Sequence, residues 1–334
     1  MPLTDEGLMR VPGLASRWVR LGDGSKAHYV TSGDEGPAVI LLHGGIPGSS
    51  GTAGFRFMAP FLGQHGFRVY CPDQPGFGLS DTRLEYHPHQ GIMSHVDFLN
   101  RFADAICVDE FFLAGNSMGC MNAAHYAVRY PHRVLGVALI AGFIGDLYPV
   151  DIPSVLRIPV DQGNDMSTMM TSIIRNKDAV SADLVAMRSR AADRNEAAWL
   201  VWQSTVQRAE VSADNARAMS TTGRLDKLDI PGIYLYGADD VLLPADPIGY
   251  DQEDLLPNFQ FFYVPDCGHQ GQTDQPELFN QVLLEFFRDG YVSRRTADLA
   301  GVSTRRPELP AIVEPRSDAL AASGIDASAA IREV

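Results

Sequence analysis

Short apolar runs alternate with segments of helical periodicity over most of this chain. A continuous apolar run is typical of a strand that a parallel sheet buries on both faces. The spacing of apolar residues indicates helices at 94–105 and 121–130. Strands that alternate with helices predict an α/β fold, a mostly parallel sheet with helices on both faces. The apolar runs occupy 38–42, 68–71, 111–114, 134–140, 232–236 and 259–264.

Three stretches depart from this alternation. Residues 18–30 alternate in polarity around a Gly-Asp-Gly turn, which predicts two antiparallel strands. Residues 144–224 lack strand-like runs and carry Met-rich and Arg-rich amphipathic segments. We therefore predict a core of residues 1–143 and 225–290, interrupted by a helical lid insertion at 144–224. The segment 291–334 holds paired arginines, prolines and an Ala/Ser-rich end. It predicts either an arm that packs across a neighbouring subunit or a partly disordered tail.

Composition narrows the classes of partner. The 334 residues carry a formal net charge of −14, which repels phosphate backbones and anionic lipid, so we expect neither nucleic acid nor a membrane as partner. The four cysteines include no Cys-x-x-Cys pair, which favours reduced thiols and a cytoplasmic setting over a disulfide framework or a metal site. The first residues carry acid rather than an apolar core, unlike a secretory signal, and no apolar run reaches the length of a membrane span.

The motif Gly115-Asn-Ser-Met-Gly119 joins the predicted strand at 111–114 to the predicted helix at 121–130. A strand, a sharp turn and a helix in this order hold the serine hydroxyl out at the carboxyl edge of a sheet. Glycines are needed at both ends of the motif, because side chains there would collide with the neighbouring strand and helix. The pattern predicts Ser117 as a nucleophile, with a plain surface Gly/Ser turn as the alternative.

A glycine-rich loop, His43 to Gly51, follows the first buried run directly. Its bare backbone N–H groups could stabilise the oxyanion of a tetrahedral intermediate if they lie beside the serine. We expect the N–H of Gly45 to be one donor, with Gly44 as a further candidate. The N–H of Met118, just after the serine, would be the other donor. The alternative is a flexible linker.

An acid and a base follow the last two predicted strands. Asp240 comes after the run at 232–236, and His269 after the run at 259–264. The chain order Ser117, Asp240, His269 is that of one serine-hydrolase fold. Histidine can remove the serine proton because its pKa is near neutral, and a carboxylate fixes its tautomer. Asp239 competes for the role of the acid and Asp266 is a weaker rival.

Together these motifs, with the turn from Asp73 to Asp81, resemble the α/β-hydrolase fold over roughly residues 15–290. The sequences His-Gly-Gly-Ile-Pro-Gly and Gly-Asn-Ser-Met-Gly are similar to those of the meta-cleavage-product hydrolases. Those enzymes hydrolyse a carbon–carbon bond in vinylogous 1,5-diketones made by ring fission of catechols. The resemblance implies that a lid arginine binds the substrate carboxylate. Arg188 occupies a comparable place, with Arg190 and Arg194 as rivals and a solvated helix face as the alternative.

The resemblance also assigns Asn116, beside the nucleophile, to the substrate site. Three positions depart from the family pattern, which has glycine at Ile46, glycine at Cys120 and tryptophan at Gln270. We expect Ile46 and Gln270 to contact substrate, because these changes alter the pocket more than the three catalytic residues.

The sequence therefore favours a cofactor-free serine hydrolase that cleaves a carbon–carbon bond of a small substrate, an anionic dienoate. One alternative is a carboxylesterase or lactonase with the same three residues. The other is a ligand-binding protein that keeps the fold with little turnover. A homo-oligomer is compatible with all three.

Overall fold

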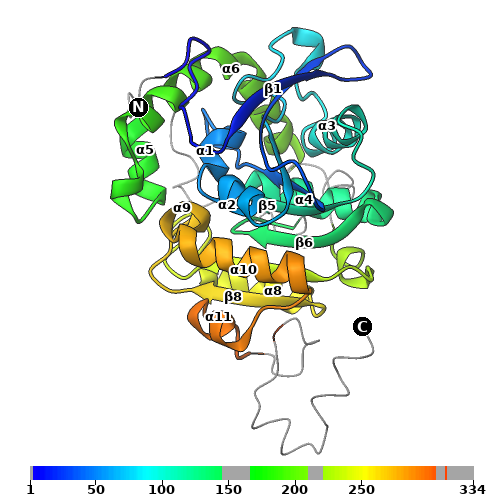
Figure 1. Ribbon diagram of the computed structural model, residues 1–334, viewed down its shortest axis with the longest axis vertical. Helices are drawn as coiled ribbons and strands as arrows, with labels where there is room; N and C mark the ends of the chain where they lie inside the picture. The colour runs from blue at the N-terminus through cyan, green and yellow to red at the C-terminus, as the bar shows by residue number, and fades with distance from the viewer. Residues whose placement is uncertain (1–2, 145–165, 210–220, 306–312, 314–334) are drawn as a thin grey trace, which may run out of the picture.

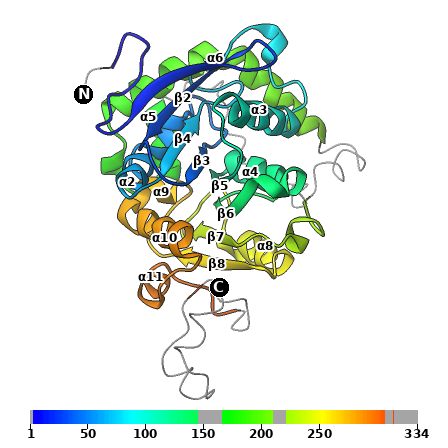
Figure 2. The ribbon, with the colours of Figure 1, turned by 45° about the vertical axis from the view of Figure 1, so that its right-hand side comes forward.

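A computed structural model of the chain describes residues 3–144, 166–209, 221–305 and 313. The predicted strands form one sheet with the order β1-β2-β4-β3-β5-β6-β7-β8 (Figures 1 and 2). β1 pairs antiparallel with β2 and β2 antiparallel with β4, whereas all other neighbours are parallel. The strands are β1 (Ala15–Arg20), β2 (Lys26–Ser32), β3 (Ala38–Leu42), β4 (Arg68–Pro72), β5 (Phe111–Asn116), β6 (Val134–Ile140), β7 (Gly232–Gly237) and β8 (Phe259–Val264).

Helices cover both faces of this sheet, as the alternation of strands and helices predicts (Figure 2). One face packs against α3 (Ile92–Ala105), α4 (Met118–Arg129) and α8 (Tyr250–Leu255). The other packs against α1 (Gly51–Phe55), α2 (Met58–Gln64), α9 (Gly271–Asp274) and α10 (Pro276–Asp289). The two apolar clusters on these faces explain why the strands are apolar throughout.

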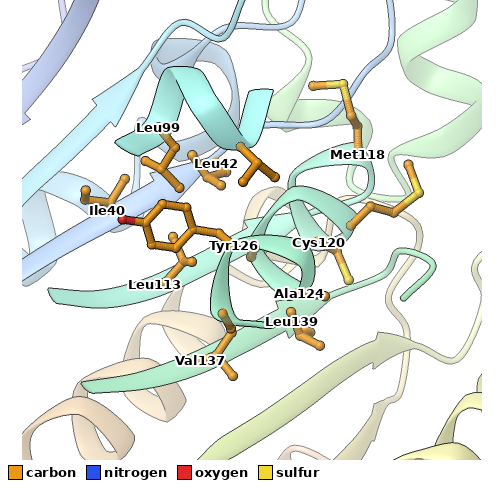
Figure 3. Packing of buried hydrophobic residues seen from close by; sticks show 14 of the residues in the cluster. Ile40, Leu42, Leu99, Leu113, Met118, Cys120, Ala124, Tyr126, Val137 and Leu139 are labelled. Carbon is orange, nitrogen blue, oxygen red and sulfur yellow. The ribbon is translucent and has the colours of Figure 1, made fainter. Parts of the chain in front are cut away.

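The centre of the molecule is the contact between β5 and α4. Figure 3 shows Tyr126 of α4 lying over Ile40 and Leu113 of the sheet, with Leu99 of α3 beside it. All four side chains are buried, and burying a side chain of this size stabilises the fold by about 1.5–3 kcal/mol. This packing holds α4, which begins directly after Ser117, against the sheet.

The segment between β6 and β7 contributes α5 (Met166–Ile173) and α6 (Ala182–Ala209) to the described structure. Two of the amphipathic parts of this stretch, 182–190 and 196–207, belong to one 28-residue helix, α6. No Gly or Pro interrupts them, and the Asn195 side chain donates to the carbonyl of Ala191 within the helix, 2.9 Å away. α6 crosses the molecule beside the β1–β2 end of the sheet (Figure 1).

The start of the predicted tail packs on its own chain. α11 (Arg294–Leu299) lies beside β8, and the N–H of Tyr263 in β8 donates to the carbonyl of Gly301 at 2.8 Å. These contacts cover an edge strand that would otherwise present unpaired backbone groups. Residues 291–305 pack on their own chain, and 306–312 and 314–334 lie outside the described residues.

Candidate active site

Ser117 occupies the turn between β5 and α4. Its backbone has φ 57° and ψ −118°, a left-handed conformation that costs a residue with a side chain about 1–3 kcal/mol. A Cβ on Gly115 would lie 2.0 Å from the carbonyl oxygen of Gly119, and one on Gly119 would lie 2.0 Å from that of Leu42. The two glycines of the motif therefore allow the close approach that holds Ser117 at the carboxyl edge of the sheet.

The glycine-rich loop after β3 lies against this turn. A Cβ built on Gly44 would be 3.2 Å from the Cβ of Ser117, and one on Gly45 would be 3.0 Å from the Cβ of Met118. The backbone of the loop and the start of α4 are thus in van der Waals contact around the serine. The structure brings together the residues expected to supply the oxyanion donors.

Asp240 and His269 meet at the ends of β7 and β8. The Nδ1 of His269 lies 2.8 Å from Oδ2 of Asp240, and both side chains are buried. The other carboxylate oxygen, Oδ1, accepts the N–H groups of Leu242 at 2.8 Å and Leu243 at 3.0 Å. A carboxylate held in this way favours the tautomer of His269 with its proton on Nδ1, which leaves Nε2 as a hydrogen-bond acceptor.

The Nε2 atom of His269 is buried and has no hydrogen-bond partner among the described residues. The hydrogen bond between the Ser117 hydroxyl and this nitrogen is therefore not formed in this structure. Catalytic hydrogen bonds are often long or poorly aligned before substrate binds. A hydrogen bond holds the segments of Ser117 and His269 together. The side-chain nitrogen of Asn116, the residue before Ser117, donates to the carbonyl of His269 at 3.0 Å.

The rival acids face away from His269. Arg175 pairs with Asp239 at 3.2 Å and with Asp266 at 3.2 Å. The Asp266 side chain is 82% exposed and that of Asp239 44%. Of the three candidate acids, Asp240 is the one whose carboxylate the structure places on the histidine ring.

Asn116 ties main-chain segments together. Besides the His269 carbonyl, its side-chain nitrogen donates to the carbonyl of Ile140 at 3.3 Å. Both amide hydrogens therefore have acceptors within the protein, so the nitrogen end of Asn116 orders the histidine loop. The contact with substrate that the resemblance implies for Asn116 stays a prediction.

Arg188 is the most deeply placed of the three candidate arginines. It is 1% exposed and its Nη2 donates to the carbonyl of Pro47 at 3.3 Å and to Oγ of Ser49 at 3.1 Å. Arg190 and Arg194 are exposed beside a surface hollow lined also by Glu6. Arg190 and Arg194 therefore lie on the solvent-exposed face of α6, whereas Arg188 does not.

The charge of Arg188 has no counter-ion in the described part of the chain. No carboxylate lies within ion-pair distance of it there, and its buried Nε has no hydrogen-bond partner. Burial and, to a smaller extent, the charge of Arg56 lower the pKa of Arg188 to about 10, so the guanidinium stays protonated at neutral pH. An unpaired buried charge is costly, and an anion beside it would offset that cost.

The three positions that depart from the family pattern each lie within three residues of Gly45, Ser117 or His269. Gln270 is buried at the start of α9, directly after His269, and Ile46 is partly buried in the loop. Cys120 is buried in the first turn of α4, and burial raises the pKa of its thiol to about 12, so it remains a neutral packing group.

The sequence pattern did not single out Trp199 and Trp202 of α6, although both contact the glycine-rich loop. The indole N–H of Trp199 donates to the carbonyl of Gly45 at 3.0 Å. A Cβ on Gly45 would lie 2.9 Å from the Cη2 atom of Trp202. The one signal available was the i, i+3 spacing of two tryptophans on an amphipathic helix, which is equally typical of plain packing.

The described residues show neither a metal site nor a membrane-spanning helix. No group of three His, Cys, Asp or Glu side chains is placed to hold a metal ion there. In the same residues no helix combines the length and apolarity that crossing a bilayer requires.

A mostly parallel sheet with a strained serine after β5, an acid after β7 and a histidine after β8 defines the serine-hydrolase class of α/β proteins. The family model for the alpha/beta hydrolase fold matches residues 37–276, and the chain belongs to this family. The predicted fold class is confirmed.

Two curated relatives show what kind of enzyme the chain resembles. It is 28% identical over 284 residues to a 2-hydroxy-6-oxononadienedioate/2-hydroxy-6-oxononatrienedioate hydrolase of Paraburkholderia phymatum, covering 81% of this chain and 95% of that protein. It is 27% identical over 270 residues to a 2-hydroxy-6-oxo-6-phenylhexa-2,4-dienoate hydrolase of Burkholderia cepacia, covering 78% of this chain and 91% of that protein.

A solved structure gives the same fold. The 2-hydroxy-6-oxo-6-phenylhexa-2,4-dienoate hydrolase from Rhodococcus sp. strain RHA1 superposes with a TM-score of 0.70 at 22% identity, covering 82% of this chain and 99% of that chain. The resemblance to meta-cleavage-product hydrolases inferred from the motifs is thus confirmed by the relatives.

Proposed function

We propose that this chain is a serine hydrolase that cleaves the carbon–carbon bond next to a ketone in a 2-hydroxy-6-oxo-dienoate. The observation that carries the proposal is Arg188, a buried guanidinium without a carboxylate partner among the described residues, bonded to the loop that holds Gly45. The relatives named above act on substrates of this class. A dienoate carboxylate would supply the missing counter-ion.

The proposed reaction begins when the 2-hydroxyl proton of the bound dienol moves to carbon 5, so that carbon 2 becomes a ketone and the original ketone at carbon 6 is joined to a saturated carbon. His269 removes the hydroxyl proton of Ser117, and the serine oxygen attacks carbon 6. The N–H groups of Gly45 and Met118 stabilise the oxyanion, and Asp240 stabilises the imidazolium. Collapse breaks the carbon–carbon bond, and the leaving group departs as a dienolate that receives the proton from His269. Water then hydrolyses the serine ester and releases a carboxylic acid.

In this proposal the segment at 144–224 is the lid that supplies Arg188, residues 1–143 and 225–290 are the catalytic core, and the described tail closes the edge of the sheet at β8. Ile46 and Gln270 line the substrate site and set its shape. The partner is a small anionic molecule.

The proposal is tested with purified protein and a panel of coloured ring-fission products. We expect the dienoate absorbance to bleach with formation of one carboxylic acid per substrate consumed. Rapid cleavage of neutral aryl esters without bleaching of any dienoate would overturn the proposal that the enzyme cleaves a carbon–carbon bond.

Arg188→Met sharpens this test. Loss of a charge-assisted contact worth about 1.5–3 kcal/mol should raise KM for the dienoate roughly 10- to 100-fold. The kcat/KM for a neutral aryl ester should stay within about threefold, because that substrate carries no carboxylate. Arg190→Met is the matched control on the same helix and should leave both substrates unaffected. An equal loss on both substrates in Arg188→Met would mean that Arg188 only supports the loop.

A second candidate function is a carboxylesterase or lactonase with the same three residues. The observation in its favour is that Ile46, Cys120 and Gln270 all differ from the family pattern and all lie beside the chemistry. Ester turnover without dienoate turnover would establish it. A non-catalytic ligand-binding protein would instead fail to react with a fluorophosphonate at Ser117.

A further inference from the structure

α6 reaches Gly45 with two tryptophans from outside the sheet. The indole N–H of Trp199 donates to the Gly45 carbonyl at 3.0 Å. The ring of Trp202 lies against the Cα of the same residue, because a Cβ there would be 2.9 Å from its Cη2 atom. One helix therefore fixes the loop residue both by a hydrogen bond and by ring packing.

Gly45 is enclosed on its other side by the first residue of α4. A Cβ on Gly45 would also lie 3.0 Å from both Cβ and Sδ of Met118. The Gly45 peptide is thus held between α4, which carries the nucleophile turn, and Trp202. A shift of α6 toward or away from the core would change the space in which this peptide can rotate.

The ring of Trp202 packs on two buried rings, those of Phe77 and His95. It lies edge-on to Phe77, with ring centroids 5.9 Å apart, and stacks on His95, with centroids 6.4 Å apart. The Nε2 of His95 donates to the carbonyl of Pro75 at 3.0 Å, and its Nδ1 lies 3.0 Å from the side-chain nitrogen of Asn122 in α4. The side that Trp202 presents to Gly45 is therefore set by the core and not by solvent.

Two further contacts hold α6 along the same loop region. Arg188 donates to the Pro47 carbonyl at 3.3 Å, and the side-chain nitrogen of Asn195 donates to the carbonyl of Gly78 at 2.7 Å. With Trp199, these contacts give α6 three bonds to the backbone of loops at the carboxyl edge of the sheet. These bonds tie the position of α6 to the backbone of the loop.

We propose that Trp199 and Trp202 are positioning residues that fix the backbone of Gly45, and with it the direction of its N–H, for oxyanion stabilisation. The position of α6 then sets how well the oxyanion is stabilised. The inference rests on the proposed function in one respect, the use of Gly45 as a donor. Trp199 holds the carbonyl side of Gly45, and Trp202 limits rotation of the same residue. Neither tryptophan is needed to bind the substrate carboxylate.

The test compares Trp199→Phe, Trp202→Leu and the control Trp18→Phe. Trp199→Phe keeps an aromatic ring and removes the N–H. Trp18 is 44% exposed on β1 and its indole N–H also has a side-chain partner, Glu6, so Trp18→Phe removes an indole hydrogen bond that does not involve the glycine-rich loop. Each variant is measured for kcat and KM with an active ester or dienoate, for inhibition by an aryl trifluoromethyl ketone, and for the rate of fluorophosphonate labelling.

We expect Trp199→Phe and Trp202→Leu to lower kcat about 10- to 100-fold, the size of effect that a small misplacement of a catalytic group produces. KM should stay within about threefold, and the affinity for the trifluoromethyl ketone, whose adduct carries the oxyanion, should fall by the same factor as kcat/KM. Trp199→His, which restores a ring N–H, should recover part of the loss. Trp18→Phe should match the unchanged protein.

Wild-type kcat and ketone affinity in Trp199→Phe would overturn the proposal, as would a loss confined to KM or to thermal stability. Labelling by the fluorophosphonate separates this proposal from the carbon–carbon activity, because phosphonylation of Ser117 uses the oxyanion site and needs no dienoate. Absence of dienoate cleavage with slow labelling of the two variants would reject the carbon–carbon activity and keep the positioning role. Absence of labelling in the unchanged protein would reject both.

Discussion

Two groupings of serine, histidine and aspartate lie in different parts of this molecule. In the first, at the β1–β2 end of the sheet, every hydrogen bond is formed. Oγ of Ser16 lies 2.9 Å from Nε2 of His28, and Nδ1 of His28 lies 2.7 Å from Oδ2 of Asp73. Burial opposes the ionisation of Asp73, but the contact with His28 and other bonds hold its pKa below the ordinary value. By side-chain contacts alone, this grouping has the complete pattern.

In the second grouping one hydrogen bond is missing. His269 contacts Asp240 at 2.8 Å, while its Nε2 has no partner among the described residues. What distinguishes this grouping is the backbone. Ser117 has φ 57° at the start of α4 and touches the glycine-rich loop, whereas Ser16 lies within an edge strand, in register with Val30.

The difference shows that a hydrogen-bonded serine, histidine and aspartate do not by themselves make a catalytic site. A nucleophile also needs backbone N–H groups aimed at the developing oxyanion and a position that substrate can reach. The loop and the turn supply these at Ser117, and the strand around Ser16 directs its N–H groups into the sheet ladder. The first grouping accordingly holds structure, and the second performs the proposed chemistry.

The largest effect is expected from Ser117→Ala. Removing the nucleophile should lower kcat by on the order of 10⁶-fold, because the covalent step is lost while binding and the oxyanion donors remain. Hydrolysis of the best substrate and the melting temperature are measured together. The strain at φ 57° is shared by alanine, so stability should change little. Activity within tenfold of the unchanged protein would remove the distinction between the two groupings.

The fold and the order of the catalytic residues could be predicted from the sequence because each depends on a local pattern. Apolar runs of four to seven residues predicted six of the strands, and the motif at 115–119 predicted the turn. Asp240 and His269 follow such runs directly, so the parallel sheet carries them to the same edge. Their catalytic roles remain predictions that the variants above and below test.

Contacts between distant segments could not be predicted in the same way. Nothing in the pattern of α6 shows that Trp199 meets Gly45, since the two are 154 positions apart. The grouping around His28 was missed for the same reason, because Asp73 lies 45 positions away and Ser16 carries no motif. Asp239 and Asp240 are sequence neighbours with equal chemistry, and only their tertiary contacts separate them, because Asp240 meets His269 and Asp239 meets Arg175.

The next largest effect is expected from Asp240→Asn. The amide would donate to Nδ1 of His269 and shift the proton to Nε2, which could then no longer act as a base. We expect kcat to fall by about 10⁴-fold with KM little changed, as for the equivalent change in other serine hydrolases. The measurement is a kcat and KM determination at pH 7. A loss no larger than tenfold would show that another acid, with Asp239 or Asp266 as the candidates, serves the histidine.

Asp73→Asn should show the opposite pattern, a loss of stability. Oδ2 of Asp73 accepts the Leu79 N–H at 2.8 Å as well as the His28 ring, and Oδ1 accepts the Gly51 N–H at 2.8 Å. An amide at this position leaves a buried donor unpaired, so the free energy of unfolding should fall by about 2 kcal/mol. Urea unfolding measures it, and kcat should fall far less than in Asp240→Asn. Unchanged stability with a 10⁴-fold loss of kcat would reverse the roles of the two groupings.

Acid should weaken the fold through histidines outside both groupings. Burial lowers the pKa of His43 and of His95 to about 4, against about 6.5 in the unfolded chain. The unfolded state therefore binds more protons between these values, and stability is lost as pH falls from 6.5 toward 4. Each histidine should cost about 2 kcal/mol between pH 7 and pH 5. Urea unfolding of His95→Gln at the two pH values should show a smaller drop than the unchanged protein, and an identical drop would exclude His95.

The smallest effect is expected from Ser16→Ala, and it tests the comparison most directly. Ser16 is exposed on β1, its hydroxyl already bonds His28, and its strand pairs in regular register with β2. Removing one part-buried hydrogen bond should change the free energy of unfolding by about 1 kcal/mol or less and leave kcat within twofold. Mass spectrometry after fluorophosphonate treatment of Ser117→Ala should find no adduct at Ser16, because no oxyanion donors converge on that hydroxyl. An adduct there, abolished by Ser16→Ala, would show that a bonded histidine and aspartate can activate a serine without the strained turn and the glycine-rich loop.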